Sequence, residues 1–196
     1  MTIDEMKEKL KTMIKPGRYQ HSLGVCETAA EMADRFGEDR NKAYLAGLLH
    51  DCAKGLTAEE CIRLWQERKI DLSPVEAENY ALHHAPAGVY IARTVFGIDD
   101  QEILNAIRYH TVGRAGMSRL EKIIYAADMI EPGRDFPGVD ALRKAARQQL
   151  DKTVWMCAES TISHNLKRQQ LIHSGTIDLW NDLMRRKEDS LYGSEG

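Results

Sequence analysis

Apolar residues recur every three or four positions along most of the chain, which is the spacing of helices that pack through one face. Val25, Ala29, Met32 and Phe36 show this spacing in one segment, and Leu120 and Ile124 show it in another. No segment alternates apolar and polar residues with β-branched enrichment, as a half-buried strand does. The pattern therefore predicts an all-α fold in which each helix buries one face.

Capping signals divide this pattern into separate helices. A hydroxyl residue followed three positions later by glutamate fits the capping box, in which both side chains satisfy free N–H groups of the first turn. Four such pairs are Thr2–Glu5, Thr57–Glu60, Ser73–Glu76 and Ser118–Glu121. We expect helices over about 3–14, 18–36, 41–54, 58–68, 74–81, 87–96, 103–110, 120–128, 139–170 and 176–186. Pro86 is expected to leave His83 and His84 at a junction between two helices.

Length and composition indicate one globular domain. The chain has 196 residues, of which 43% are hydrophobic and 29% charged, an ordinary composition for a folded domain. It contains no linker, repeat or low-complexity tract. We therefore predict a single domain over 1–196, with C-terminal helices over 139–186 and a frayed tail over 187–196.

Charge and targeting signals exclude several classes of function. A net charge of -3 gives no electrostatic basis for binding nucleic acid or an anionic membrane. The first ten residues lack the apolar region of a signal peptide, and no apolar run approaches the roughly 20 residues that span a bilayer. The four cysteines show no paired spacing, which is typical of reduced thiols. We expect a cytoplasmic protein with neither a nucleic-acid nor a membrane partner.

The strongest chemical signal is the adjacent pair His50–Asp51 at the end of an apolar helical run, followed by Lys54. An imidazole and a carboxylate on neighbouring faces of a helix can both reach one metal ion. Gly47 lies one turn before Asp51, where it costs helix stability and permits a close approach by another group. Taken alone, a His-Asp pair is more often chance than a site.

Further polar residues at the inward ends of helices raise those odds. Asp128 continues the stripe of Ile124, where a carboxylate is costly to bury unless it is paired or bound to metal. The complete set is His21, His50, Asp51, His84, His110 and Asp128. Nitrogen and oxygen donors without thiolate suit iron, with manganese, cobalt and zinc as alternatives, better than a structural zinc. Arg18, Lys54 and Arg134 flank these positions, and clustered cations beside a metal suit phosphoryl transfer.

These residues resemble a known family. His21, the His50–Asp51 pair and Asp128 resemble the signature of HD-domain phosphohydrolases, which are helical bundles with the metal site between core helices. The segments around 50–54, 84–88, 107–114 and 130–139 resemble more closely the bacterial YqeK-type symmetrical diadenosine tetraphosphatases. The resemblance covers about residues 16–145; beyond it, the last fifty residues are similar only in being helical.

The resemblance implies an activity and a role for each residue. It implies hydrolysis of diadenosine tetraphosphate into two ADP, with one or two divalent metal ions. His21, His50, Asp51 and Asp128 would hold the first ion, and His84 and His110 a second one that Asp51 also contacts. The catalytic residues would be Asp51, Lys54 and His110. The substrate-binding residues would be Arg18, Lys54, His84, His110, Thr111, Gly113 and Arg134.

Several alternatives remain open at this stage. The same site could act on a nucleoside monophosphate, a cyclic nucleotide or (p)ppGpp, or could bind a nucleotide without turnover. His83 precedes His84, and the register set by Pro86 favours His84 as the ligand. His164 and His173 match no motif. A homodimer is possible.

Overall fold

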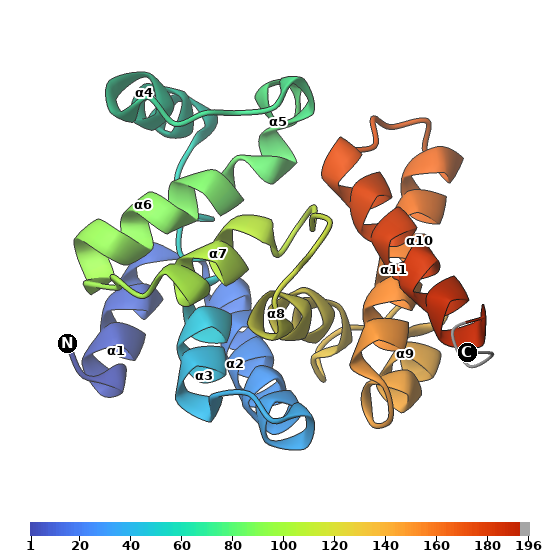
Figure 1. Ribbon diagram of the computed structural model, residues 1–196. Coiled ribbons are helices and arrows are strands. Elements are labelled where there is room, and N and C mark those ends of the chain that lie inside the picture. Colours follow the sequence, from blue (N-terminus) through green and yellow to red (C-terminus); the bar gives the residue numbers. More distant parts are fainter. Residues whose placement is uncertain (193–196) are drawn as a thin grey trace.

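The computed structural model describes the backbone of residues 1–192 and the side chains of residues 1–186. Within that range every regular element is a helix, as the sequence predicts (Figure 1). No helix among the described residues is long and apolar enough to span a bilayer.

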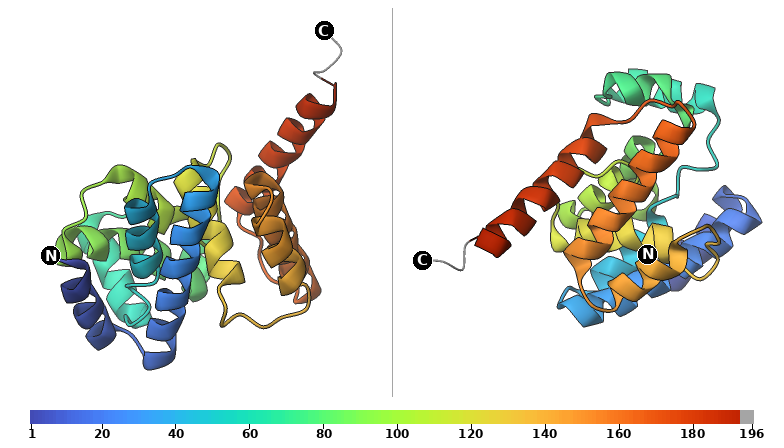
Figure 2. Two further views of the ribbon diagram at one scale, coloured as in Figure 1. Left: turned by 90° about the horizontal axis from the view of Figure 1, so that it is seen from below. Right: turned by 90° about the vertical axis from the view of Figure 1, so that its right-hand side faces the viewer.

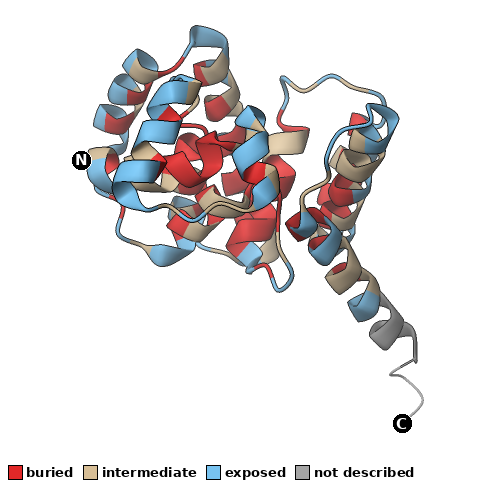
Figure 3. Ribbon diagram, turned by 90° about the horizontal axis from the view of Figure 1, so that it is seen from above, coloured by how far each residue is buried: buried red, intermediate tan, exposed pale blue. Residues whose placement is uncertain are grey.

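Four helices form the centre of the molecule: α2 (Pro16–Phe36), α3 (Arg40–Leu49), α7 (Gln101–Tyr109) and α8 (Arg119–Ile130). Their apolar stripes face one another, and the burial is concentrated on these inner faces (Figure 3). Fully buried aliphatic side chains from these helices include Val25, Leu48, Ile107 and Ile124. Burying such a side chain contributes about 1.5–3 kcal/mol, so this core holds the helix ends that carry the polar residues in place.

Two further groups of elements cover this centre. Helices α1 (Ile3–Met13) and α6 (His84–Phe96) pack against it in Figure 1. Helix α4 (Ala58–Arg68), helix α5 (Pro74–Glu78) and the 3-10 turn η1 (Tyr80–Leu82) lie at the top of that view. This upper part has a small apolar cluster of its own, made by Ala53, Cys61, Trp65 and Ala87.

A buried ion pair ties this upper part to the centre. Glu76 in α5 is 1% exposed, and its carboxylate accepts hydrogen bonds from Arg108 of α7 at 2.6 and 3.0 Å. His173, just before α11, lies with Nε2 2.8 Å from the Ser73 hydroxyl, which caps α5. The short helix α5 is therefore held by contacts with two distant parts of the chain.

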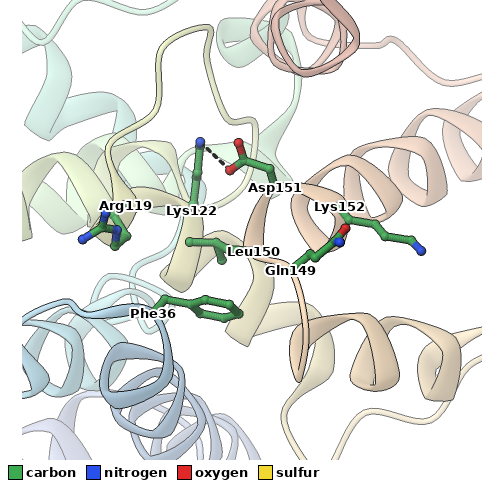
Figure 4. A pocket seen from close by; sticks show the side chains of 7 residues that line it. All are labelled: Phe36, Arg119, Lys122, Gln149, Leu150, Asp151 and Lys152. Atoms are coloured by element: carbon green, nitrogen blue, oxygen red, sulfur yellow. Dashed lines mark hydrogen bonds and ion pairs between the residues drawn. The ribbon is translucent and has the colours of Figure 1, made fainter. Parts of the chain in front are cut away.

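The C-terminal helices α9 (Val139–Ala146), α10 (Leu150–Lys167) and α11 (Ser174–Tyr192) lie side by side on one flank (Figure 2). At the start of α10, Asp151 accepts a 2.6 Å hydrogen bond from Lys122 of α8, beside a depression of about 610 Å³ (Figure 4). The residues that line this depression include no member of the His/Asp set. The depression therefore lies at the contact between α8 and α10, away from the cluster of candidate ligands.

All four predicted capping boxes are present, with both reciprocal hydrogen bonds formed in each. Helix α2 begins at Pro16 rather than near Arg18, because proline is well suited to the first helical position. Helix α11 is longer at both ends than the predicted 176–186. It continues to Tyr192, so part of the predicted frayed tail is helical, and residues 193–196 lie outside the described range.

The expected helix over 41–54 is wrong at its end. Helix α3 stops at Leu49, and tight turns follow, with Cys52 N–H donating to Leu49 O at 3.0 Å and Lys54 N–H to Asp51 O at 2.9 Å. His50 Nδ1 lies 2.6 Å from the Gly47 carbonyl, which would otherwise accept a backbone bond from the next turn. The chain thus leaves the helix at the His-Asp pair, which turns these side chains toward the interior.

Three other elements differ from the prediction. The expected helix over 74–81 ends at Glu78 as α5, because Asn79 is extended, and residues 80–82 form the separate 3-10 turn η1. The expected helix over 139–170 is broken into α9 and α10 by a turn in which Gln149 is extended. The apolar spacing continues across this turn, so periodicity alone does not reveal it. Helix α6 begins at His84 instead of about Ala87, with Pro86 as its third residue. Proline is tolerated there because the first N–H groups of a helix have no helical partner.

Candidate metal centre

The six predicted His and Asp residues converge from five helices. His21 lies in α2, Asp128 in α8, and His50 and Asp51 at the end of α3. His21 Nε2 is 2.9 Å from Asp128 Oδ1 and 3.2 Å from His50 Nε2. His50 Nε2 is in turn 3.4 Å from Asp51 Oδ2. These four side chains therefore surround one point.

The second group shares Asp51. Its other oxygen, Oδ1, lies 3.1 Å from His84 Nε2 at the start of α6 and 3.6 Å from His110 Nε2 at the end of α7. The two imidazoles approach each other to 3.1 Å between their Nε2 atoms. Asp51 therefore faces one set of imidazoles with each carboxylate oxygen. Three overlapping groups of potential ligand atoms, each group within 4.8 Å, cover all six residues.

The protonation of the rings fits a cation at this place. Nδ1 of His50 and of His110 lies 2.6 and 2.8 Å from the backbone carbonyls of Gly47 and Ile107. A carbonyl oxygen only accepts, so Nδ1 carries the proton in the neutral form of each ring, and Nε2 is then free to bind a metal. The Nε2 atoms face one another and the carboxylate oxygens at 3.1 to 3.6 Å, so a positive charge, either a proton or a metal ion, is needed between them. A divalent metal coordinated by imidazole and carboxylate meets this need, so the donor set is of the HD type and suits a metal.

The electrostatics also favour positive charge in the cluster. Burial disfavours the charged form of Asp51, but the charge of His50 and hydrogen bonds from three imidazoles outweigh it and hold the Asp51 pKa well below its ordinary value. The pKa of Asp128 is likewise lowered despite burial, chiefly by its hydrogen bond with His21. Burial lowers the pKa of His84 to about 4, which keeps that ring neutral. Burial disfavours the charged form of His50, but the neighbouring Asp51 and Asp128 outweigh it and raise the His50 pKa. Ionised carboxylates and neutral imidazole are the forms that bind metal, so a metal ion would take the place of the His50 proton.

Three cations border the cluster, as the sequence predicts. Arg18 Nη1 lies 2.9 Å from Asp51 Oδ2. The guanidinium group of Arg134 donates to both the backbone carbonyl and the carboxylate of Asp128. Lys54 Nζ is 3.5 Å from the Ala81 carbonyl, and burial lowers the pKa of its ammonium group. Arg18 and Arg134 also line a surface groove, so a phosphate group at the edge of the cluster would lie within reach of their guanidinium groups.

Two residues expected to bind substrate differ in their surroundings. Thr111 directly follows His110 and is half-buried. Gly113 has a positive φ of 66°, and its N–H donates to Tyr109 O at 2.8 Å. A Cβ at Gly113 would lie 2.5 Å from Leu179 of α11, so this glycine permits close packing there. A role for the Gly113 N–H in phosphate binding stays a prediction.

Three histidines, His83, His164 and His173, lie outside the cluster of candidate ligands. The His83 ring packs edge-on against Trp65 and Tyr80, with centroid distances of 4.0 and 5.4 Å. His84 is the one that contacts Asp51, consistent with the register set by Pro86. His173 bonds to Ser73, and His164 is exposed on α10.

Glu131 is a residue that the sequence reasoning did not assign to the site. It directly follows α8 and is 4% exposed, with Oε1 3.0 Å from His21 Nδ1 and Oε2 accepting the Gly133 N–H at 2.6 Å. A carboxylate on the outer nitrogen of a metal-binding imidazole fixes its tautomer and orientation. In the sequence, only its position three residues after Asp128 indicates that Glu131 lies near the site.

A groove of about 690 Å³ opens from this edge of the cluster. Arg18, His21 and Arg134 lie at its inner end, and it follows α2 outward to Glu31. The turn at Pro132 forms its opposite wall. The cluster is thus continuous with a surface groove large enough for part of a ligand.

Comparison with known proteins agrees with this geometry. Residues 18–133 match the model of the HD domain family. The chain is 40% identical to the symmetrical bis(5'-nucleosyl)-tetraphosphatase of Bacillus subtilis (strain 168) over 94% of this chain and 98% of that protein. It is 41% identical to the protein of the same name from Halalkalibacterium halodurans, over 90% and 96% of the two chains.

A solved structure from Clostridium acetobutylicum, described as a "predicted HD superfamily hydrolase involved in NAD metabolism", is 44% identical. It superposes with a TM-score of 0.91 and covers 95% of this chain and 98% of its own. With the convergent His/Asp cluster, these matches show that the chain belongs to the HD-domain family, in the group of the symmetrical bis(5'-nucleosyl)-tetraphosphatases.

Proposed function

We propose that this protein is a metal-dependent phosphohydrolase that cleaves diadenosine tetraphosphate symmetrically into two ADP. The observation that carries the proposal is the position of Asp51, whose two oxygens face separate sets of imidazoles beside three cations. Relatives about 40% identical over nearly the whole chain carry the name of this activity. The finer assignments of metal and residue roles below are part of the proposal.

His21, His50, Asp51 and Asp128 would hold one ion, and His84 and His110, with Asp51, would hold a second. A bound divalent metal supplies Lewis acidity and lowers the pKa of water. Iron is the proposed metal, with manganese, cobalt and zinc as alternatives, because the donors are nitrogen and oxygen without thiolate. Metal analysis of the purified protein, and of its Asp51→Asn variant, tests this assignment.

The chain's own cations would hold the tetraphosphate. Arg18 and Arg134 present guanidinium groups, whose forked geometry suits phosphate oxygens. In the reaction the oxygen of one water bonds to a phosphorus beside the central bridging oxygen, and the bond from that phosphorus to the bridging oxygen breaks. ADP leaves carrying the bridging oxygen, whose negative charge the ammonium group of Lys54 would stabilise, while His110 would act as a ligand of the second ion.

The experiment that tests the proposal is an assay of the metal-loaded protein with a panel of nucleotides. The panel contains diadenosine tetraphosphate, a nucleoside monophosphate, a cyclic nucleotide and (p)ppGpp. We expect hydrolysis of diadenosine tetraphosphate to ADP with the highest kcat/KM. Faster turnover of another member would assign the site to that substrate, and binding without turnover of any would make the protein a nucleotide-binding module.

A further inference from the structure

The groove beside the cluster has opposite charges at its two ends. At the inner end Arg18 and Arg134 flank the carboxylates of the site. At the outer end, Glu27 and Glu31 project from successive turns of α2 and are both exposed. Positive charge at one end and negative charge at the other suits a ligand whose phosphates lie inside and whose far end is uncharged.

The walls of the groove suit a nucleoside. Its volume of about 690 Å³ falls in the range of small-molecule sites, roughly 300–1,000 Å³. Leu23 and Pro132 supply apolar surface, and Gln20 and Thr28 supply hydrogen-bonding groups. Carboxylates accept hydrogen bonds from an exocyclic amine and from ribose hydroxyls, both of which adenosine carries.

The basic residues beyond the outer end are engaged with the backbone. Arg143 donates to the carbonyls of Ile130 and Arg134 at 3.1 and 2.8 Å, and Arg35 donates to that of Arg147 at 3.3 Å. These arginines line a neighbouring depression on the far side of Glu31 and do not line the groove. Glu27 and Glu31 are therefore the charged side chains of the groove itself that meet the far end of a ligand.

We propose that this groove binds the second nucleoside of the substrate, on the side of the leaving ADP. Glu27 and Glu31 then select a polyphosphate chain that ends in a nucleoside over one that ends in a phosphate. The terminal phosphate of a mononucleoside tetraphosphate carries negative charge, which would lie beside two carboxylates and be repelled. This inference rests on the proposed function, because it assigns the second half of the same substrate.

The test compares two substrates that share the same tetraphosphate. Diadenosine tetraphosphate and water give two ADP, whereas adenosine 5'-tetraphosphate and water give ADP and pyrophosphate. We expect the wild type to prefer the dinucleotide by kcat/KM. In the double variant Glu27→Gln/Glu31→Gln this preference should fall about tenfold, which corresponds to about 1.4 kcal/mol, mainly through faster use of adenosine 5'-tetraphosphate.

The matched control is Asp4→Asn/Glu8→Gln, which removes the same charge from exposed i,i+4 positions of α1, outside the groove. It should leave the preference unchanged. A second variant, Thr28→Trp, narrows the groove and should lower kcat/KM for the dinucleotide much more than for adenosine 5'-tetraphosphate. Circular dichroism verifies its folding, and if it does not fold, the charge variant alone decides.

An unchanged preference in Glu27→Gln/Glu31→Gln, or an equal change in the α1 control, would overturn the assignment of the groove. The proposed function fails in a different way, namely if the wild type does not convert diadenosine tetraphosphate to ADP.

Discussion

Replacing Glu131 tests whether the carboxylate behind His21 prepares that ring for metal. In Glu131→Gln the side chain keeps its size, but one amide oxygen cannot accept from both His21 Nδ1–H and Gly133 N–H, which lie 3.0 and 2.6 Å from the two carboxylate oxygens. If the amide nitrogen faces His21, Nδ1 must become the acceptor and the proton moves to Nε2. Nε2 then faces Asp128 as an N–H group and can no longer bind metal.

The expected loss of metal affinity follows from the wrong tautomer of this one histidine. Changing the outer partner of a metal-binding histidine typically costs 10–100-fold in metal affinity or activity, so we expect a loss of about that size in Glu131→Gln. The fold should be nearly unaffected, because the volume and one hydrogen bond remain. Glu131→Ala leaves two buried donors without partners and should lower the free energy of unfolding by about 3 kcal/mol.

The assay is competition with a coloured chelator, which measures metal affinity without turnover, together with chemical denaturation of each variant. Asp135→Asn, an exposed change on the same turn, is the control and should behave as wild type. Metal affinity equal to wild type in Glu131→Gln would refute the reasoning, because His21 would then be oriented without Glu131.

Three further changes test other parts of the account. Asp51→Asn should abolish turnover while circular dichroism shows an intact helical fold; activity within about tenfold of wild type would contradict contact with two ions. His84→Ala should greatly lower kcat and keep one metal, whereas His83→Ala should be much milder, and reversed effects in metal analysis and kinetics would reject His84 as the ligand. Burial disfavours the charged form of Glu76, but the nearby His173 and the hydrogen bonds from Arg108 outweigh it and lower the Glu76 pKa in the folded state. The contribution of Glu76 to stability is therefore complete above its unfolded-state pKa and is lost as the pH falls from there through the lower folded-state pKa. Glu76→Gln should cost about 2 kcal/mol at pH 7 and clearly less near pH 3, and an equal loss at both would show that ionisation is irrelevant.

Much of the fold was predictable because its signals are local. Each capping box needs only two side chains three residues apart, and all four form. The helical stripes likewise report which face of a segment is buried. The break between α9 and α10 was not predicted, because the apolar spacing continues through the turn at Gln149. The early end of α3 depends on the contact of His50 with Gly47, which is a property of the folded side chain.

The sequence also predicts only part of the candidate site. Inward helix ends marked His21, His110 and Asp128 as candidates, and the structure brings them together. That Asp51 faces two groups of imidazoles could not be read from spacing, because it depends on how α3, α6 and α7 meet. The role of Glu131 was not predicted for a related reason. Only the packing of its turn against α2 shows that its carboxylate reaches His21.

The most direct test of the central claim is hydrolysis of diadenosine tetraphosphate by the metal-loaded protein in water enriched with heavy oxygen. Mass spectrometry of the products identifies which phosphorus is attacked. The account predicts ADP as the sole nucleotide product, with one heavy oxygen incorporated for each molecule of substrate cleaved. AMP together with ATP would contradict symmetrical cleavage, even if every metal ligand assigned above proved correct.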